Sequence, residues 1–217
     1  MALAAIFQMR LYKLNKELDN IFSTLEFEEG GGIQITGTDW YSDDLRIEFS
    51  INTGVDGQSQ LWEIQINGVR TNLIKSDFAD RIELFEEHPL LWPYNQLQTS
   101  LYFGRPTKKP YELFAGLYRV HLQETKKWFS FDKYINTNVQ IIELCKSTTG
   151  LFASGPIKLL EAYKKELETH EMNPTIVGGH NPEHRTNNQR AEEKAQLKVL
   201  VIGDSYVVGE TFEFSRA

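Results

Sequence analysis

SQLWEIQINGVRTNLIKSDFADRIELFEEHPLLWPYNQLQTSLYF, residues 59–103, is the stretch that decides the fold of this chain. Apolar and polar residues alternate repeatedly along it, and it contains Trp62 and Trp92, two of the four tryptophans. Such alternation places apolar side chains on one face of a half-buried β-strand. The stretch therefore predicts the sheet onto which the rest of the chain packs.

The alternation predicts an antiparallel meander of about five or six strands within residues 44–103, an α+β fold with helices packed mainly on one face of the sheet. Residues 45–51 and 62–66 form the first hairpin, each with apolar residues at every second position. Asn67-Gly68 is the strongest turn dipeptide, so residues 69–74 are expected to return as a third strand. Residues 82–84 and 97–103 supply two more strands.

Helical spacing predicts the remaining elements. An amphipathic N-terminal helix is expected over residues 6–22, followed by a turn at Gly30-Gly31-Gly32, and a helical part over residues 110–169. The clearest helix follows Pro156, with Leu159, Leu160, Tyr163 and Leu167 on one stripe. Residues 138–146 fit a helix or a strand equally well.

The C-terminal part combines a polar stretch with two apolar runs. Residues 170–196 contain prolines, glycines and many amides, which predicts a long polar loop. Residues 197–214 are expected to form a strand or a hairpin around Gly203-Asp204-Ser205. We interpret residues 1–217 as a single α+β domain.

Charge is distributed unevenly along the chain. Its net charge is −7, but residues 1–104 carry 16 acidic and 7 basic side chains, a net −9, while residues 105–217 carry a net +2. Residues 17–48 alone hold nine carboxylates and one base, Arg46. Such a surface repels phosphate backbones and attracts basic partners, although carboxylates also simply keep a protein in solution. Nucleic-acid binding is therefore disfavoured.

Cysteine usage and the N-terminus bear on the compartment. The single cysteine, Cys145, lies in an apolar context and has no partner for an internal disulfide, which favours a buried, reduced thiol in the cytoplasm. The N-terminal apolar run is interrupted by Gln8 and Arg10, so we expect neither a signal sequence nor a membrane span.

One motif resembles an enzyme signature. In KVLVIGDSYVVGE, residues 198–210, a strand leads into Gly-Asp-Ser, which resembles the first block of SGNH-type serine hydrolases. That resemblance implies that Ser205 is the nucleophile. Only twelve residues follow Ser205, however, and no histidine lies beyond His184 to activate it. We therefore expect a Gly-Asp turn here, with catalysis by Ser205 as the alternative.

The residues of the other candidate sites are better explained by structural roles than by binding or catalysis. His180 and His184 have the i,i+4 spacing of a metal pair, but Pro182 between them opposes a regular helix. Asp39, Asp43 and Asp44 lack the alternating spacing and the glycine of a calcium loop. We expect His121 to be a satisfied core histidine, and HPLLWPY, residues 88–94, to pack Trp92 in the core rather than to offer an aromatic patch to a partner. No cofactor and no metal are expected.

Three segments carry a resemblance to known proteins: HPLLWPY at 88–94, LYRVH at 117–121 and SGPIKLLEAY at 154–163. Together they resemble uncharacterised bacterial proteins associated with polymorphic-toxin immunity loci. The resemblance spans roughly residues 60–210 and implies a bacterial cytoplasmic protein, but its motifs are structural and imply no chemistry.

These observations favour a non-enzymatic protein that binds a basic partner, such as an immunity protein that neutralises a bacterial toxin. Electrostatic steering would precede burial of aromatic anchors. The alternatives are a serine hydrolase-like enzyme and a homo-oligomeric structural adaptor, and the oligomeric state stays open. The expected partner-binding residues are Glu28, Glu29, Asp39, Trp40, Asp43 and Asp44.

Overall fold

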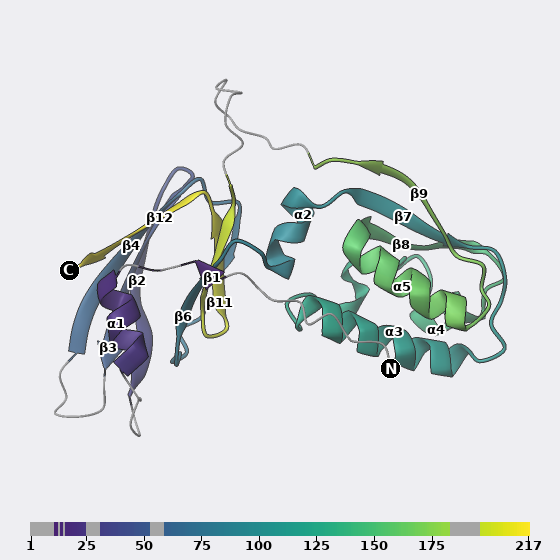
Figure 1. Ribbon diagram of the computed structural model, residues 1–217, viewed down its shortest axis with the longest axis horizontal. Coiled ribbons are helices and arrows are strands. Elements are labelled where there is room, and N and C mark those ends of the chain that lie inside the picture. Colours follow the sequence, from purple (N-terminus) through teal and green to yellow (C-terminus); the bar gives the residue numbers. More distant parts are fainter. Residues whose placement is uncertain (1–10, 13, 15, 25–30, 53–58, 183–195) are drawn as a thin grey trace. The chain divides into compact units, whose positions relative to one another are not determined.

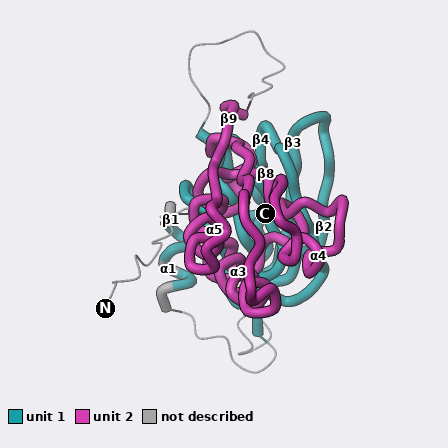
Figure 2. The backbone as a smooth tube through the Cα atoms, turned by 90° about the vertical axis from the view of Figure 1, so that its right-hand side faces the viewer, with its two compact units in different colours: residues 1–88, 190–217 teal, residues 89–189 magenta. Residues whose placement is uncertain are grey.

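The computed structural model describes residues 11–12, 14, 16–24, 31–52, 59–182 and 196–217. The protein has an α+β fold in which all strand pairs are antiparallel among these residues. Whereas we interpreted the sequence as one domain, the chain forms two compact units (Figure 2), residues 1–88 with 190–217 and residues 89–189. The strands of the described residues likewise form three sheets rather than one meander.

Unit 1 (residues 1–88 and 190–217) contains two of the sheets (Figure 1). The four-stranded sheet has the order β12-β4-β3-β2, and the five-stranded sheet has the order β1-β6-β10-β11-β5. The four strands of the first are β2 (Gly32–Tyr41), β3 (Asp44–Asn52), β4 (Ser59–Asn67) and β12 (Thr211–Arg216). Those of the second are β1 (Leu11–Tyr12), β5 (Thr71–Leu73), β6 (Ile82–Phe85), β10 (Lys198–Ile202) and β11 (Ser205–Gly209).

Alternation along β3 and β4 builds the core of unit 1, as the sequence predicts. Except for Leu61, which is 54% exposed on the opposite face, their apolar residues face one side and are almost completely buried. There they meet apolar residues of β6, β10 and β11 and Leu18 of helix α1 (Lys16–Thr24). Burying a side chain of this size stabilises the fold by about 1.5–3 kcal/mol. The buried residues of β3 and β4 are Leu45, Ile47, Phe49, Ile51, Trp62, Ile64 and Ile66.

The predicted helix over residues 6–22 is wrong in its first part. The described helix α1 begins only at Lys16, and Leu11 and Tyr12 form strand β1 instead. Leu11 pairs with Phe85 and Tyr12 with Leu84, so ladder hydrogen bonds to β6 replace helical ones. Residues 6–10 lie outside the described residues. So does Gly30, the first glycine of the predicted turn.

The strand after Asn67-Gly68 does not return to β4. The chain turns there, but β5 pairs with β11. Both edges of β4 are already occupied by β3 and β12, so no hydrogen-bonding edge remains for β5. Tertiary pairing therefore overrides the local hairpin signal.

Unit 2 (residues 89–189) combines the third sheet with most of the helices. Its sheet has the order β8-β7-β9, with β7 (Gln98–Phe103), β8 (Gly150–Pro156) and β9 (Thr175–His180). Helix α5 (Ile157–Thr169) packs on β7 and β8, and α3 (Pro110–Thr125) packs on α5 (Figure 1). The shorter helices are η1 (Pro89–Leu91), α2 (Trp92–Asn95), η2 (Phe131–Lys133) and α4 (Ile141–Lys146).

The helical predictions are confirmed where the apolar stripe is long. Pro110 begins α3, and the predicted stripe of α5 is completely buried. Residues 141–146, which fitted a helix or a strand, form helix α4. Trp92 is 2% exposed, so HPLLWPY packs in the core as expected.

Two predicted boundaries need correction. The helical part over residues 110–169 contains strand β8, and the polar loop over residues 170–196 contains strand β9. Strand β9 is an edge strand whose residues are mostly exposed, so it lacks the apolar alternation by which a strand is recognised. Its backbone pairing with β7 holds it in place. Among the described residues, no helix is long and apolar enough to cross a membrane.

Candidate functional site

The β2–β3 hairpin brings together most of the predicted partner-binding residues. The strands are joined through Ser42, whose φ of 59° is the left-handed conformation of a tight turn, and Asp43. Trp40 is 49% exposed and Tyr41 is 59% exposed, so about half of each aromatic side chain faces water. Asp39 and Asp43 are also exposed beside them. We call residues 39–43 the hairpin tip.

Asp44 has a structural role at the base of this tip. Its Oδ1 accepts a hydrogen bond of 3.1 Å from the backbone N–H of Gly68, and the carbonyl of Asp43 accepts one of 2.8 Å from the N–H of Val69. These bonds fix the hairpin against the turn that follows β4. The remaining predicted residues, Glu28 and Glu29, lie outside the described residues.

The sheet adds one carboxylate, Glu63, that the linear sequence did not group with the tip. Asp39 lies opposite Arg46 in the β2–β3 register. The Nη2 atom of Arg46 is 2.9 Å from Glu48 Oε1 and 2.8 Å from Glu63 Oε2. Among the described residues, Asp39 itself makes no ion pair. The alternation of β4 predicts that Glu63 points away from the core, but only the register places it beside Arg46.

Tyr41 is the tip residue that sequence reasoning missed. It follows Trp40 directly and is the more exposed of the two aromatics. Adjacent strand residues point to opposite faces, so the two neighbouring aromatics lie on different faces of β2. At the end of a hairpin both faces are open to solvent, which is why both rings are exposed.

Ser205 is a structural hydroxyl rather than an exposed nucleophile. Strands β10 and β11 form the predicted hairpin, and Ser205 is the first residue of β11 and 3% exposed. Its Oγ accepts a 2.9 Å hydrogen bond from the Lys75 N–H and lies 3.3 Å from the Lys75 carbonyl, to which it can donate. An SGNH-type site needs a helix after the serine, and here a strand follows.

Ser205→Ala is therefore expected to lower the free energy of unfolding by about 1 kcal/mol, because the Lys75 backbone loses a partly buried hydrogen-bond partner. Urea unfolding monitored by tryptophan fluorescence measures this change. Ser215→Ala, at an exposed position of β12, is the control and should change stability by less than about 0.5 kcal/mol. Incubation of the folded protein with an organophosphonate should give no mass adduct at Ser205; an adduct would contradict the structural role.

The remaining candidate groups are buried or outside the described residues. His121 is 0% exposed and satisfied by two hydrogen bonds, as expected. Burial raises the pKa of the Cys145 thiol to about 11, so it stays protonated near neutral pH. His180 lies exposed at the end of β9, and His184 is not described. No group of three or more potential metal ligands occurs among the residues that the structure describes.

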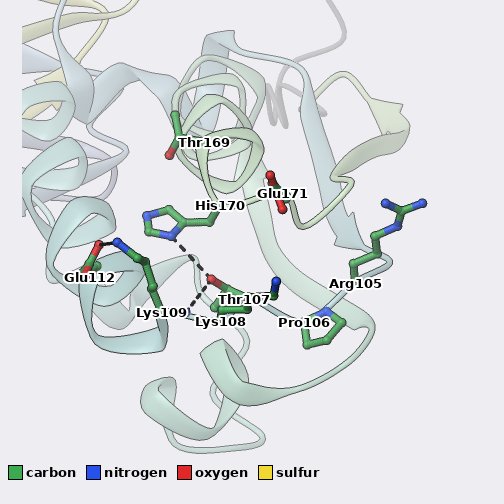
Figure 3. A pocket seen from close by; sticks show the side chains of 9 residues that line it. All are labelled: Arg105, Pro106, Thr107, Lys108, Lys109, Glu112, Thr169, His170 and Glu171. Carbon is green, nitrogen blue, oxygen red and sulfur yellow. Dashed lines mark hydrogen bonds and ion pairs between the residues drawn. The ribbon is translucent and has the colours of Figure 1, made fainter.

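Unit 2 also has an open pocket of about 680 Å³ between the segment after β7 and the end of α5 (Figure 3). Arg105, Lys108 and Lys109 line it, but Lys109 Nζ lies 2.8 Å from the Glu112 carboxylate, and Glu171 lines it too. At its centre in the view, His170 Nδ1 faces the Thr107 hydroxyl at 3.5 Å. The lining thus mixes three cationic side chains with two carboxylates, and one of the cations is already paired.

Neither the protein families, nor the curated proteins, nor the solved structures compared with this chain include a match to it. The function is therefore inferred from the chain's own geometry. Of the places described above, the hairpin tip is where predicted binding residues come together in an exposed group.

Proposed function

We propose that this protein is a non-enzymatic binding module that engages a basic protein through its hairpin tip. The single observation that carries the proposal is the exposure of Trp40 and Tyr41 by about half beside the carboxylates of Asp39 and Asp43. Exposed large aromatics leave apolar surface in water that a partner can bury at a gain of about 25 cal/mol per Å². Trp and Tyr are also the residues most enriched among interface hot spots.

The charges at the tip indicate that the partner's contacting surface is positively charged. Asp39 and Asp43 add to the acidic surface that continues over Glu48 and Glu63, where Arg46 neutralises only part of the charge. A basic partner would be attracted during diffusional encounter, so its association would slow as salt rises. An immunity protein that masks a bacterial toxin would work in this way, by occlusion and without chemistry.

Charge reversal tests this proposal. Asp39→Lys with Asp43→Lys is expected to slow association about tenfold or more and to flatten its salt dependence, because steering changes association rates by tenfold to a thousandfold. The partner is first isolated by pull-down from cells that express the protein. Its association with the purified variant is then followed by stopped-flow at several salt concentrations.

Asp77→Lys with Asp80→Lys is the matched control. It changes the net charge equally, and both positions are exposed and flank Ala79. Ala79 bridges to Ile33, at the opposite end of β2 and about 25 Å of strand from Tyr41. If both double variants slow association equally, the net charge of the protein accounts for the slowing, and the tip is excluded as the binding site.

A further inference from the structure

Helix α3 has apolar residues on two opposite sides. It packs on α5 as the outer layer of unit 2 (Figure 1), with Leu113 and Leu117 buried on its inner side. The outer side carries a second apolar stripe, in which Tyr111 is 69% exposed and Tyr118 is 47% exposed. A helix that is apolar all round is normally covered on every side. We call four residues the outer stripe: Tyr111, Ala115, Tyr118 and Leu122.

The two aromatic rings of the outer stripe are held in place within unit 2. The Tyr118 ring meets Phe131 edge to face, with the ring centroids 5.3 Å apart and the planes at 90°. The Tyr111 ring lies 6.0 Å from the Nζ atom of Lys146. Side chains that are already ordered lose less conformational entropy when a partner covers them. The stripe is therefore suited to anchor a helix that packs on it.

The spacing of the outer stripe matches a second copy of the same helix. Successive stripe residues are four, three and four positions apart, as the a and d positions of a coiled coil are. This spacing is the same in both chain directions. In an antiparallel pair of α3 helices, Tyr111 therefore lies opposite Leu122 of the second copy, and Ala115 lies opposite Tyr118. At the centre, each small Ala115 side chain leaves room for the Tyr118 ring of the other copy.

The charges beside the outer stripe complement each other in the same antiparallel arrangement. Glu112 and Arg119 are exposed, and each directly follows a stripe tyrosine, so both lie along one flank. An antiparallel copy brings Glu112 of each helix toward Arg119 of the other, whereas a parallel copy brings like charges together. Arg119 makes no ion pair among the described residues, and Glu112 pairs only with exposed Lys109. Charged flanks of this kind set the orientation of paired helices.

We propose that the outer stripe of α3 is the interface of a symmetric homodimer in which two α3 helices pack antiparallel. A two-fold axis requires a surface that complements itself, and this face does so in its apolar spacing, in its side-chain sizes and in its flanking charges. The inference does not rest on the hairpin tip, which lies in unit 1.

Ala115→Glu tests the interface, because it places a charged side chain where the Tyr118 ring of the second copy packs. Light scattering after size exclusion should show the mass of the unmodified chain rising with concentration from one copy toward two. Ala115→Glu is expected to raise the dissociation constant of the dimer at least about tenfold. Gln123→Glu, which adds the same charge at an exposed position of α3 outside the stripe, is the control and should dimerise normally. A monomer at every concentration would overturn the proposal, as would a dimer that Ala115→Glu leaves unchanged.

A charge exchange tests the antiparallel orientation. Glu112→Arg is expected to raise the dissociation constant roughly threefold or more, because arginines then face each other across the interface. Combining Glu112→Arg with Arg119→Glu restores opposite charges and should bring the constant back toward that of the unmodified protein. Circular dichroism checks that both variants stay folded. If the folded double variant dimerises as weakly as the single variant, the antiparallel arrangement is wrong.

Discussion

Replacing Trp40 and Tyr41 together with alanine is expected to weaken binding of the basic partner by at least about 30-fold, since hot-spot aromatics contribute about 2 kcal/mol or more. Both side chains are about half exposed at the hairpin tip and would bury their remaining surface against the partner. The loss should appear mainly as faster dissociation, because short-range contacts act after encounter. Surface plasmon resonance with the isolated partner gives both rate constants.

Phe78→Ala is the matched control for this variant. Phe78 is 65% exposed in unit 1 but lies next to Ala79, at the far end of β2. It should bind the partner as the unmodified protein does. The Trp40 and Tyr41 variant should also unfold within about 1 kcal/mol of the unmodified protein, because surface substitutions rarely exceed about 0.5 kcal/mol each. An unchanged dissociation rate in the folded Trp40 and Tyr41 variant would contradict the proposal that these aromatics anchor the partner.

His121→Leu is expected to lower the free energy of unfolding by about 2–4 kcal/mol, since it leaves two buried polar groups without a partner. His121 Nε2 lies 2.8 Å from the Phe129 carbonyl, which can only accept, so this nitrogen carries the proton. Nδ1 then accepts the hydroxyl hydrogen of Tyr163 at 2.7 Å. The imidazole therefore joins α3, α5 and the segment after α3 inside unit 2. Denaturant unfolding followed by circular dichroism measures the cost.

A double-mutant cycle with Tyr163→Phe isolates this interaction. Tyr163→Phe alone should cost about 1–2 kcal/mol, because His121 loses one partner. The double variant should lose less stability than the sum of the losses in the single variants. With both side chains replaced, neither the imidazole nor the phenol is left buried without its partner. Additive costs would mean that the two side chains are not coupled.

The same histidine predicts a pH dependence. Burial lowers the pKa of His121, and the opposing effects of the Phe129 hydrogen bond and the Asp132 charge are smaller. Its folded-state pKa therefore lies below the unfolded value of 6.5. As pH falls below 6.5, the unfolded chain takes up a proton that the folded protein does not, so stability falls. The stability difference between the unmodified protein and His121→Leu should accordingly narrow below pH 6.5.

The hairpin tip could be predicted in part because it is local. Asp39, Trp40 and Asp43 lie close together in the sequence, and a tight turn keeps them together in space. Glu63 could not be grouped with them, because the β3–β4 register places it beside Arg46. The role of Ser205 was predictable only as a turn, since its partner Lys75 lies on a distant segment.

The sequence by itself determined the elements whose burial follows a strong period. The inward faces of β3 and β4 and the stripe of α5 are buried as their spacing indicates, because side-chain direction depends only on local backbone geometry. Tertiary structure decided what those elements pair with: the division into three sheets and two units, the pairing of β5 with β11, and the existence of β1 and β9. These depend on backbone hydrogen bonds between distant segments, and backbone groups are the same in every residue except proline, so side-chain patterns carry little record of them.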